Sequence, residues 1–158
     1  MKFDVFSISN ESEFNKFALE IFDYQSKNIP IYKTYIEQLN KSKPIHYSKI
    51  PCLPISFFKT HKVCTPDSNP EAIFKSSGTT GQQRSQHFVE DLSIYRQSFR
   101  LAYNKLIGNP SDQVILALLP NYIEQGESSL VYMVDHLIQA TNNPLSGFLL
   151  NNMSEIEK

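Results

Sequence analysis

The chain has 158 residues, 41% of them apolar and 20% charged, with a net charge of −1 at pH 7. This length and apolar content favour one packed domain, and the near-zero net charge argues against a general nucleic-acid or membrane-surface binder. The sequence shows no signal-peptide pattern and no window of about 18 apolar residues that would indicate a membrane span. We therefore expect a cytoplasmic, soluble protein.

Two helices are expected in the first 50 residues. The sequence Asn10-Glu11-Ser12-Glu13 is typical of a helix start, and apolar residues then recur at helical spacing. A second helix is expected over 31–39. Their aromatic stripe favours core packing, with a groove for an acyl chain as the alternative. The apolar positions are Phe14, Phe17, Ala18, Ile21, Phe22, Tyr32, Tyr35, Ile36 and Leu39.

The middle of the chain predicts loops and short strands. Residues 40–54 are polar and contain three prolines, which indicates a surface loop. A strand is expected over 55–58, turn residues fill 65–70, and further strands are expected over 72–75 and 86–89.

The most regular helical pattern begins at Glu90-Asp91, and Gly108 suits its end. A further helix is expected over about 128–140, with His136 pointing away from its apolar face. The charged residues of the first of these helices are expected in solvent. The two apolar faces comprise Leu92, Tyr95, Phe99, Ala102, Tyr103 and Leu106, and then Leu130, Val134, Leu137 and Ile138; the charged residues are Arg96, Arg100 and Lys105.

Two apolar runs in this half of the chain predict buried strands. Residues 114–119 are apolar without alternation, which favours a central strand of a sheet covered on both faces. Residues 147–150 form the second run. If the sheet is parallel there, residues 120–126 lie near a ligand cleft, because ligands bind beyond the carboxyl ends of such strands.

The stretch 76–85 combines glycine, hydroxyl residues and Arg84. Glycine lets the backbone approach a ligand, successive N–H groups can hold an anion, hydroxyls add donors, and arginine adds a permanent charge. The stretch therefore predicts a polyphosphate cradle, and the alternative is a flexible hairpin turn. It is not a Walker loop, because no lysine follows Gly81, and it contains no G-x-G-x-x-G.

The order Ser-Ser-Gly-Thr-Thr-Gly-x-x-Arg over 76–84 resembles the phosphate-loop signature of the adenylate-forming ligase superfamily, which usually ends in Gly-x-Pro-Lys. Gln83 stands where proline is usual, and Arg84 stands where lysine is usual. The phrases LPISFFKTH at 53–61 and SSLVYMVDH at 128–136 further resemble the acyl-protein synthetase group, the long-chain fatty-acid luciferin-component ligase type. The resemblance covers the chain from Leu53 onward.

The resemblance implies an α/β fold with an N-terminal helical segment at 1–50 and an incomplete portion of the layered adenylate-forming domain at 51–158. It implies that ATP, with Mg²⁺, activates a fatty or other carboxylic acid as an acyl-adenylate, and that a thiol acceptor, such as one on a protein, then takes the acyl group. The residues it assigns to the β- and γ-phosphates of ATP are Ser76, Ser77, Gly78, Thr79, Thr80, Gly81 and Arg84.

Family members also carry an aromatic-x-x-Thr-Glu segment, a ribose-binding aspartate and a late lysine, and this sequence contains no Thr-Glu pair. No catalytic residue is therefore assigned, and the chain alone is expected to be inactive. It is interpreted as the N-terminal portion of a longer ligase or as a module that works with a partner chain. An incomplete sheet also favours homo-oligomers. The hypothesis of a different class is a non-catalytic module that binds a nucleotide or a partner protein.

Other groups of polar residues give little support for a metal site or a hydrolase active site. The four histidines are far apart, and Cys52 and Cys64 lack metal spacing, so no metal site is predicted and both thiols are expected to be reduced. A serine hydrolase is disfavoured because residues 126–130 lack the second glycine of a nucleophile elbow. Asp135 and His136 are also adjacent, so on a helix they point in different directions.

Overall fold

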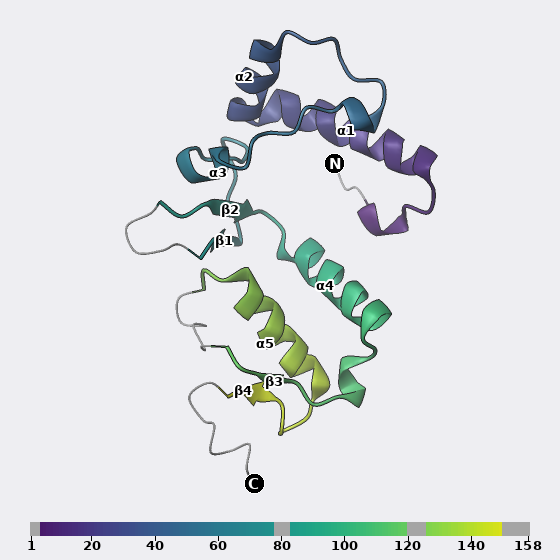
Figure 1. Ribbon diagram of the computed structural model, residues 1–158, viewed down its shortest axis with the longest axis vertical. Helices are drawn as coiled ribbons and strands as arrows, with labels where there is room; N and C mark the ends of the chain where they lie inside the picture. Colours follow the sequence, from purple (N-terminus) through teal and green to yellow (C-terminus); the bar gives the residue numbers. More distant parts are fainter. Residues whose placement is uncertain (1–3, 78–82, 120–125, 150–158) are drawn as a thin grey trace. The chain divides into compact units, whose positions relative to one another are not determined.

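The computed structural model describes residues 4–77, 83–119 and 126–149 (Figure 1). The chain forms two compact units, one of Met1–Asn69 with Gly78–Phe88 and one of Pro70–Ser77 with Val89–Lys158. The described residues form helices and short strands, as expected for the general α/β class. No helix among them is long and apolar enough to cross a membrane.

The first unit begins with the two expected helices, α1 (Glu11–Asn28) and α2 (Pro30–Leu39), preceded by the 3-10 turn η1 (Val5–Ser7). The Asn10 side chain accepts a 2.9 Å hydrogen bond from the Glu13 N–H and so caps α1. Pro30 occupies the first turn of α2, where its missing N–H costs nothing. Asn40 then ends α2 in the left-handed conformation, with φ of 45°.

Aromatic residues form the core of this unit. Phe22 and Tyr32 are buried, and their rings meet edge to face with centroids 6.2 Å apart. The Tyr32 hydroxyl donates a 2.6 Å hydrogen bond to the Pro51 carbonyl, which ties α2 to the loop that follows it. That loop contains the 3-10 turn η2 (Tyr47–Lys49). The prediction that this aromatic stripe packs in a core is confirmed at these two residues, although Phe14 is 46% exposed.

The strand predicted over 55–58 is wrong. Residues 55–56 form a turn, and the short helix α3 (Phe57–Thr60) follows. The Phe57 N–H donates to the Pro54 carbonyl, and the helical spacing lets the Phe57 ring stack on His61, with centroids 5.1 Å apart. The aromatic side chains therefore pack through a helical turn, and no strand partner is needed.

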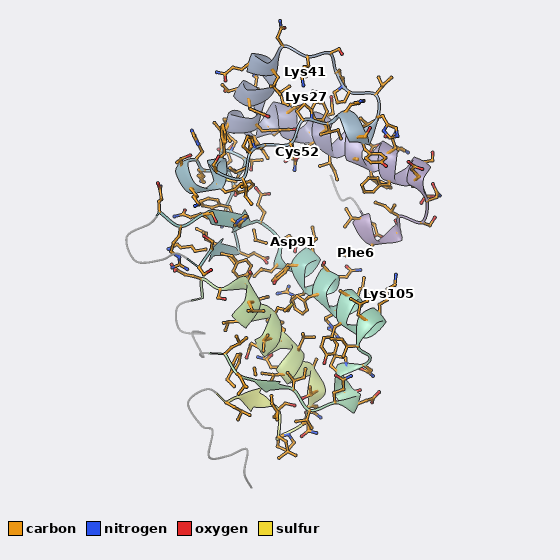
Figure 2. The ribbon with its side chains drawn as sticks, in the orientation of Figure 1. Phe6, Lys27, Lys41, Cys52, Asp91 and Lys105 are labelled. Atoms are coloured by element: carbon orange, nitrogen blue, oxygen red, sulfur yellow. The ribbon has the colours of Figure 1, made fainter. Side chains whose placement is uncertain are left out.

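The second unit contains the helices α4 (Leu92–Leu106) and α5 (Ser129–Thr141), which lie side by side in Figure 1. Asp91 caps α4 by accepting from the Ser93 N–H, and Lys105 lies in its last turn, where a positive charge complements the helix dipole (Figure 2). Gly108, with φ of +131°, follows this helix as predicted. The 3-10 turn η3 (Pro110–Asp112) comes next.

The described strands are short. The expected strands β1 (Ala72–Lys75) and β2 (Gln86–Val89) are the strands of one two-stranded sheet. Strands β3 (Leu116–Ala117) and β4 (Gly147–Phe148) form another, in which they run parallel with Leu116 opposite Gly147 and Ala117 opposite Phe148. Helix α5 is the crossover between the two parallel strands.

The strand predicted over 114–119 is shorter than expected, since only residues 116–117 form β3, and its two faces differ in solvent exposure. Ala117 is 7% exposed, whereas Leu116 and Leu118 are 50% and 58% exposed. Within the described residues only one face of β3 is buried, so the prediction of a strand covered on both faces is corrected. In the predicted strand 147–150, residues 147–148 form β4, and Leu150 lies outside the described residues.

The helical faces of the second unit also depart from the prediction. Leu130 is 48% exposed, and Val131 is buried in its place; Ala102 and Leu106 of α4 are exposed as well. His136 was expected to point away from the apolar face, but its ring stacks on Tyr132 with centroids 4.3 Å apart. Aromatic stacking therefore brings this polar residue into the packed face.

Arg96 is a further correction, because it is half-buried and not simply solvated. Its guanidinium donates a 3.0 Å hydrogen bond to the Tyr132 hydroxyl. The long aliphatic stem of arginine allows such partial burial while its head group keeps a polar partner.

The core of the second unit supplies a matched stability test. Phe99 is 6% exposed and packs against Tyr95 and His136, whereas Leu101 on the same helix is 48% exposed. Phe99→Ala should lower the free energy of unfolding by about 3 kcal/mol, because it removes a buried ring and leaves a cavity. Leu101→Ala should cost less than about 1 kcal/mol. Urea unfolding of both variants is the measurement, and equal effects would contradict this packing.

Candidate functional site

The predicted phosphate loop is described at its two ends. Ser76 is half-buried and Ser77 is exposed at its start, while Arg84 is half-buried near its end and is followed by the buried Ser85. The four middle residues of the predicted cradle, Gly78, Thr79, Thr80 and Gly81, lie outside the described residues. The arrangement of the loop around a phosphate therefore stays a prediction, whereas the residues that fix the start of the loop are described.

Two interactions fix the start of the loop to Glu127, which lies two residues before α5. The Lys75 N–H donates a 2.7 Å hydrogen bond to the Glu127 carbonyl. The side chains of the same two residues form an ion pair, in which each is 30% exposed. Because Lys75 is the last residue of β1, Ser76 follows directly from this double contact. Sequence reasoning missed the pair, since its members are 52 residues apart and no local pattern links them.

Aromatic packing inside the second unit also supports the start of the predicted phosphate loop. Phe74 is 6% exposed, and its ring centroid lies 5.6 Å from those of both Tyr95 and Tyr132. The Tyr95 hydroxyl donates a 3.0 Å hydrogen bond to the Ser129 carbonyl in the first turn of α5. Burial raises the pKa of Tyr95, so its hydroxyl remains protonated and available as a donor near neutral pH.

The topology of the second unit indicates on which side of the small parallel sheet Glu127 lies. Helix α5 returns the chain from the carboxyl end of β3 to the amino end of the parallel strand β4. The N-terminus of α5, and Glu127 with it, therefore belongs to the carboxyl-end side of this small sheet. Ligands of parallel α/β sheets bind on that side. The contact between Lys75 and Glu127 thus starts the predicted phosphate loop where the fold class places ligands.

Residues that could suggest other chemistry have structural partners. Ser128 caps α5 by accepting a 3.3 Å hydrogen bond from the Val131 N–H, and the Asp135 carboxylate accepts from Gln139. The ring of His87 stacks on Phe58, with centroids 4.8 Å apart. Within the described ranges, no group of three or more His, Cys, Asp or Glu residues could hold a metal ion. Cys52 and Cys64 are free thiols.

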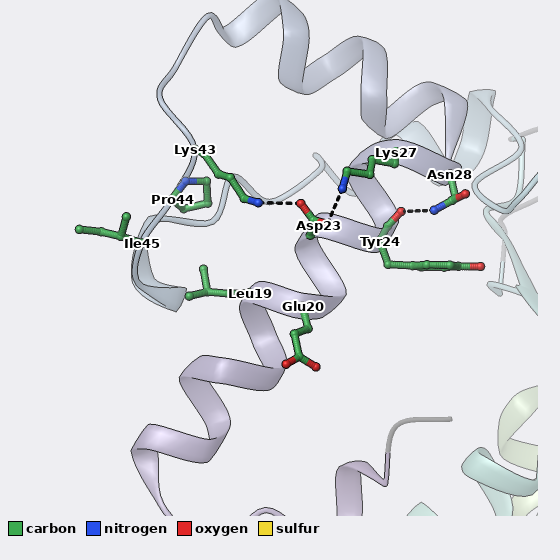
Figure 3. Close-up of a pocket in the computed structure, with 9 residues that line it drawn as sticks. All are labelled: Leu19, Glu20, Asp23, Tyr24, Lys27, Asn28, Lys43, Pro44 and Ile45. Carbon is green, nitrogen blue, oxygen red and sulfur yellow. Dashed lines mark hydrogen bonds and ion pairs between the residues drawn. The ribbon is translucent and has the colours of Figure 1, made fainter. Parts of the chain in front are cut away.

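A separate hollow of about 730 Å³ lies in the first unit, between α1 and residues 43–45 (Figure 3). Asp23 lies between two lysines there, 2.5 Å from Lys27 and 2.7 Å from Lys43. Hydrogen bonds from Lys27 and Lys43 lower the pKa of Asp23 to about 2. The lysine charges are therefore already paired within the protein. The hollow includes no residue of the predicted phosphate loop, and we regard it as a surface groove.

Comparison with protein-family models, with curated proteins and with solved structures finds no match for this chain. The residues of the loop and the contacts that fix its start are therefore the features that bear on function.

The Asp23 cluster gives a test of the electrostatics of the first unit. A carbon-13 NMR titration of the Asp23 carboxyl should give a midpoint near pH 2, well below the ordinary 3.8. Since the pKa is lowered in the folded state, the stabilising contribution is present above pH 3.8 and is lost as the pH falls through about 2. Lys43→Met should raise the midpoint. A wild-type midpoint at the ordinary value would show that the ion pairs do not persist in solution.

Proposed function

We propose that the loop at 76–85 binds the triphosphate of ATP, and that the chain contributes this site to an acyl-activating reaction of the adenylate-forming type. The proposal treats the second unit as part of the larger layered α/β domain of such a ligase. The observation that carries it is the double contact between Lys75 and Glu127, which starts a glycine- and hydroxyl-rich loop on the carboxyl-end side of the parallel strands β3 and β4, the side on which parallel α/β sheets generally bind ligands.

The residues of the loop suit this ligand chemically. Phosphate oxygens accept hydrogen bonds, and the loop offers five hydroxyl groups together with backbone N–H groups that glycine can turn toward an anion. Arg84 adds a charge that persists at any physiological pH and can donate two parallel hydrogen bonds. Mg²⁺ arrives with ATP and neutralises part of the phosphate charge. The hydroxyl residues assigned to the β- and γ-phosphates are Ser76, Ser77, Thr79 and Thr80.

The proposed reaction joins a carboxylate oxygen of the acid substrate to the α-phosphorus of ATP. The bond from that phosphorus to the bridging oxygen breaks, and pyrophosphate leaves with the electron pair. Positioning and charge neutralisation supply most of the catalysis in phosphoryl-group chemistry. The role proposed for this chain is to hold the departing β- and γ-phosphates. A fatty acid is the proposed substrate and a thiol the proposed acyl acceptor, and no residue of this chain is assigned to either.

Substitutions in the loop test the phosphate assignment. Arg84→Ala should weaken binding of Mg·ATP by about 10- to 100-fold, because a charge-assisted hydrogen bond contributes roughly 1.5–3 kcal/mol. Thr80→Val, which removes one hydroxyl at similar volume, should weaken it by less. Arg100→Ala, at an exposed arginine of α4, is the matched control and should change nothing. Isothermal titration calorimetry gives the affinities, and wild-type binding in both loop variants would contradict the assignment.

A kinetic assay separates a ligase from a binding module. In the ligase of which this chain is the proposed N-terminal portion, fatty acid should stimulate exchange of labelled pyrophosphate into ATP. Arg84→Ala should slow that exchange by the factor seen in binding. Tight ATP binding by that protein without acid-dependent exchange, for a series of chain lengths, would instead favour the non-catalytic nucleotide-binding module.

A further inference from the structure

We propose that the Arg96 guanidinium and the Tyr132 hydroxyl bind the carboxylate of a small organic acid, at a position between α4 and α5 that we term the Arg96–Tyr132 site. The site goes beyond the proposed function, in which no residue of this chain is assigned to an acid. Both side chains belong to the second unit and are described by the structure. Carboxylate binding at this site does not involve the loop at 76–85.

Arg96 carries a positive charge that no carboxylate balances within the described residues. Its guanidinium is half-buried, and its partner there is a phenol, the Tyr132 hydroxyl, at 3.0 Å. Arginine keeps its charge at any physiological pH. Partial burial removes some of the water that would otherwise solvate this charge, so an anion that takes the place of the remaining water is stabilised by it.

Donors of the two side chains lie close enough together to bind one carboxylate. A guanidinium has five N–H groups, and Arg96 donates one of them to the Tyr132 oxygen. The Tyr132 hydroxyl accepts that bond and keeps its own O–H to donate, for which no acceptor lies among the described residues. A carboxylate has two oxygens, so one can accept from Arg96 while the other accepts from Tyr132.

Packing in the second unit fixes the Tyr132 ring before a ligand arrives. His136 stacks on this ring with centroids 4.3 Å apart, and its Nδ1–H donates to the Tyr132 carbonyl at 3.2 Å. Phe74 packs against the same ring at 5.6 Å. The neighbouring Tyr95 hydroxyl already donates to the Ser129 carbonyl, so Tyr132 is the tyrosine left to donate to a ligand. A donor held in place in this way loses little conformational entropy on binding.

The charge of the site favours a carboxylate over a phosphate. One arginine matches a monoanion, whereas a phosphate monoester carries about −1.5 to −2 charges at pH 7. The planar guanidinium also matches the planar carboxylate group. The rings of Tyr132 and His136 are half-buried and offer apolar surface to the body of an organic acid. The alternative role for Arg96 is to join α4 to α5 through Tyr132 without binding any ligand.

The test follows the backbone amide shifts of the 158-residue chain by NMR while sodium benzoate is added without nucleotide. Saturable shifts are expected within 93–100 and 129–136. Arg96→Met should weaken benzoate binding about tenfold or more, and Tyr132→Phe, which keeps the ring packing, about fivefold. Arg100→Met is the matched control, because it removes an exposed charge one turn further along the same helix and should leave the affinity unchanged. Inorganic phosphate should bind more weakly than benzoate.

Every outcome supports the site or overturns it. Weaker binding in both site variants, with the control unchanged, supports it. Wild-type affinity in Arg96→Met or in Tyr132→Phe, or shifts that do not saturate in the wild type, would show that Arg96 only joins the two helices. Tighter binding of phosphate than of benzoate would overturn the assignment to a carboxylate. If Arg96→Met does not fold, Tyr132→Phe decides alone. Because no nucleotide is present, failure of this site leaves the triphosphate assignment unaffected.

Discussion

Burial of the Phe74 ring is the interaction on which the second unit depends. This ring lies against Tyr95 of α4 and Tyr132 of α5 at the same centroid distance of 5.6 Å, so it joins β1 to both helices. It also sets the position of the following residue, Lys75, whose backbone and side chain both reach Glu127. Apolar packing and electrostatics thus act on adjacent residues, and the loop at 76–85 begins immediately after them.

The proposed function follows from the chemical difference between the loop at 76–85 and the hollow on α1. The hollow has lysines, but Asp23 pairs with both of them, and no glycine-rich backbone borders it. The loop brings hydroxyl groups, glycines and an arginine together in ten residues, and its start is anchored on the carboxyl-end side of the parallel strands, where α/β sheets generally bind ligands. Anion recognition therefore favours the loop over the hollow.

Local chemistry in the sequence predicted much of the secondary structure. Asn10 and Asp91 cap the helices that follow them, and Gly108 takes the positive φ that the end of α4 requires. The strands at 72–75 and 86–89 were likewise predicted from the sequence, because Gly- and Ser-rich residues separate them. These features depend on interactions a few residues long, so a single sequence contains the information needed to predict them.

The errors arose where tertiary contacts decide the outcome. Residues 55–58 have strand-like composition, yet a helical turn lets Phe57 stack on His61. Charge suggested that Arg96 is solvated, and helical spacing suggested that His136 points away from the apolar face of its helix. Tyr132 instead supplies a hydrogen-bond acceptor to Arg96 and a stacking surface to His136. For the candidate site, composition identified the loop, but nothing local to Lys75 indicates Glu127.

The most direct test of the central claim is to map the triphosphate onto the chain by NMR. Backbone amide shifts would be followed in the assigned 158-residue protein while Mg²⁺ and inorganic triphosphate are added together. The account predicts that the largest saturable shifts occur within 76–85, with smaller changes at 126–130. Largest shifts at the hollow, in 19–28 and 43–45, or no saturable shift anywhere, would contradict it.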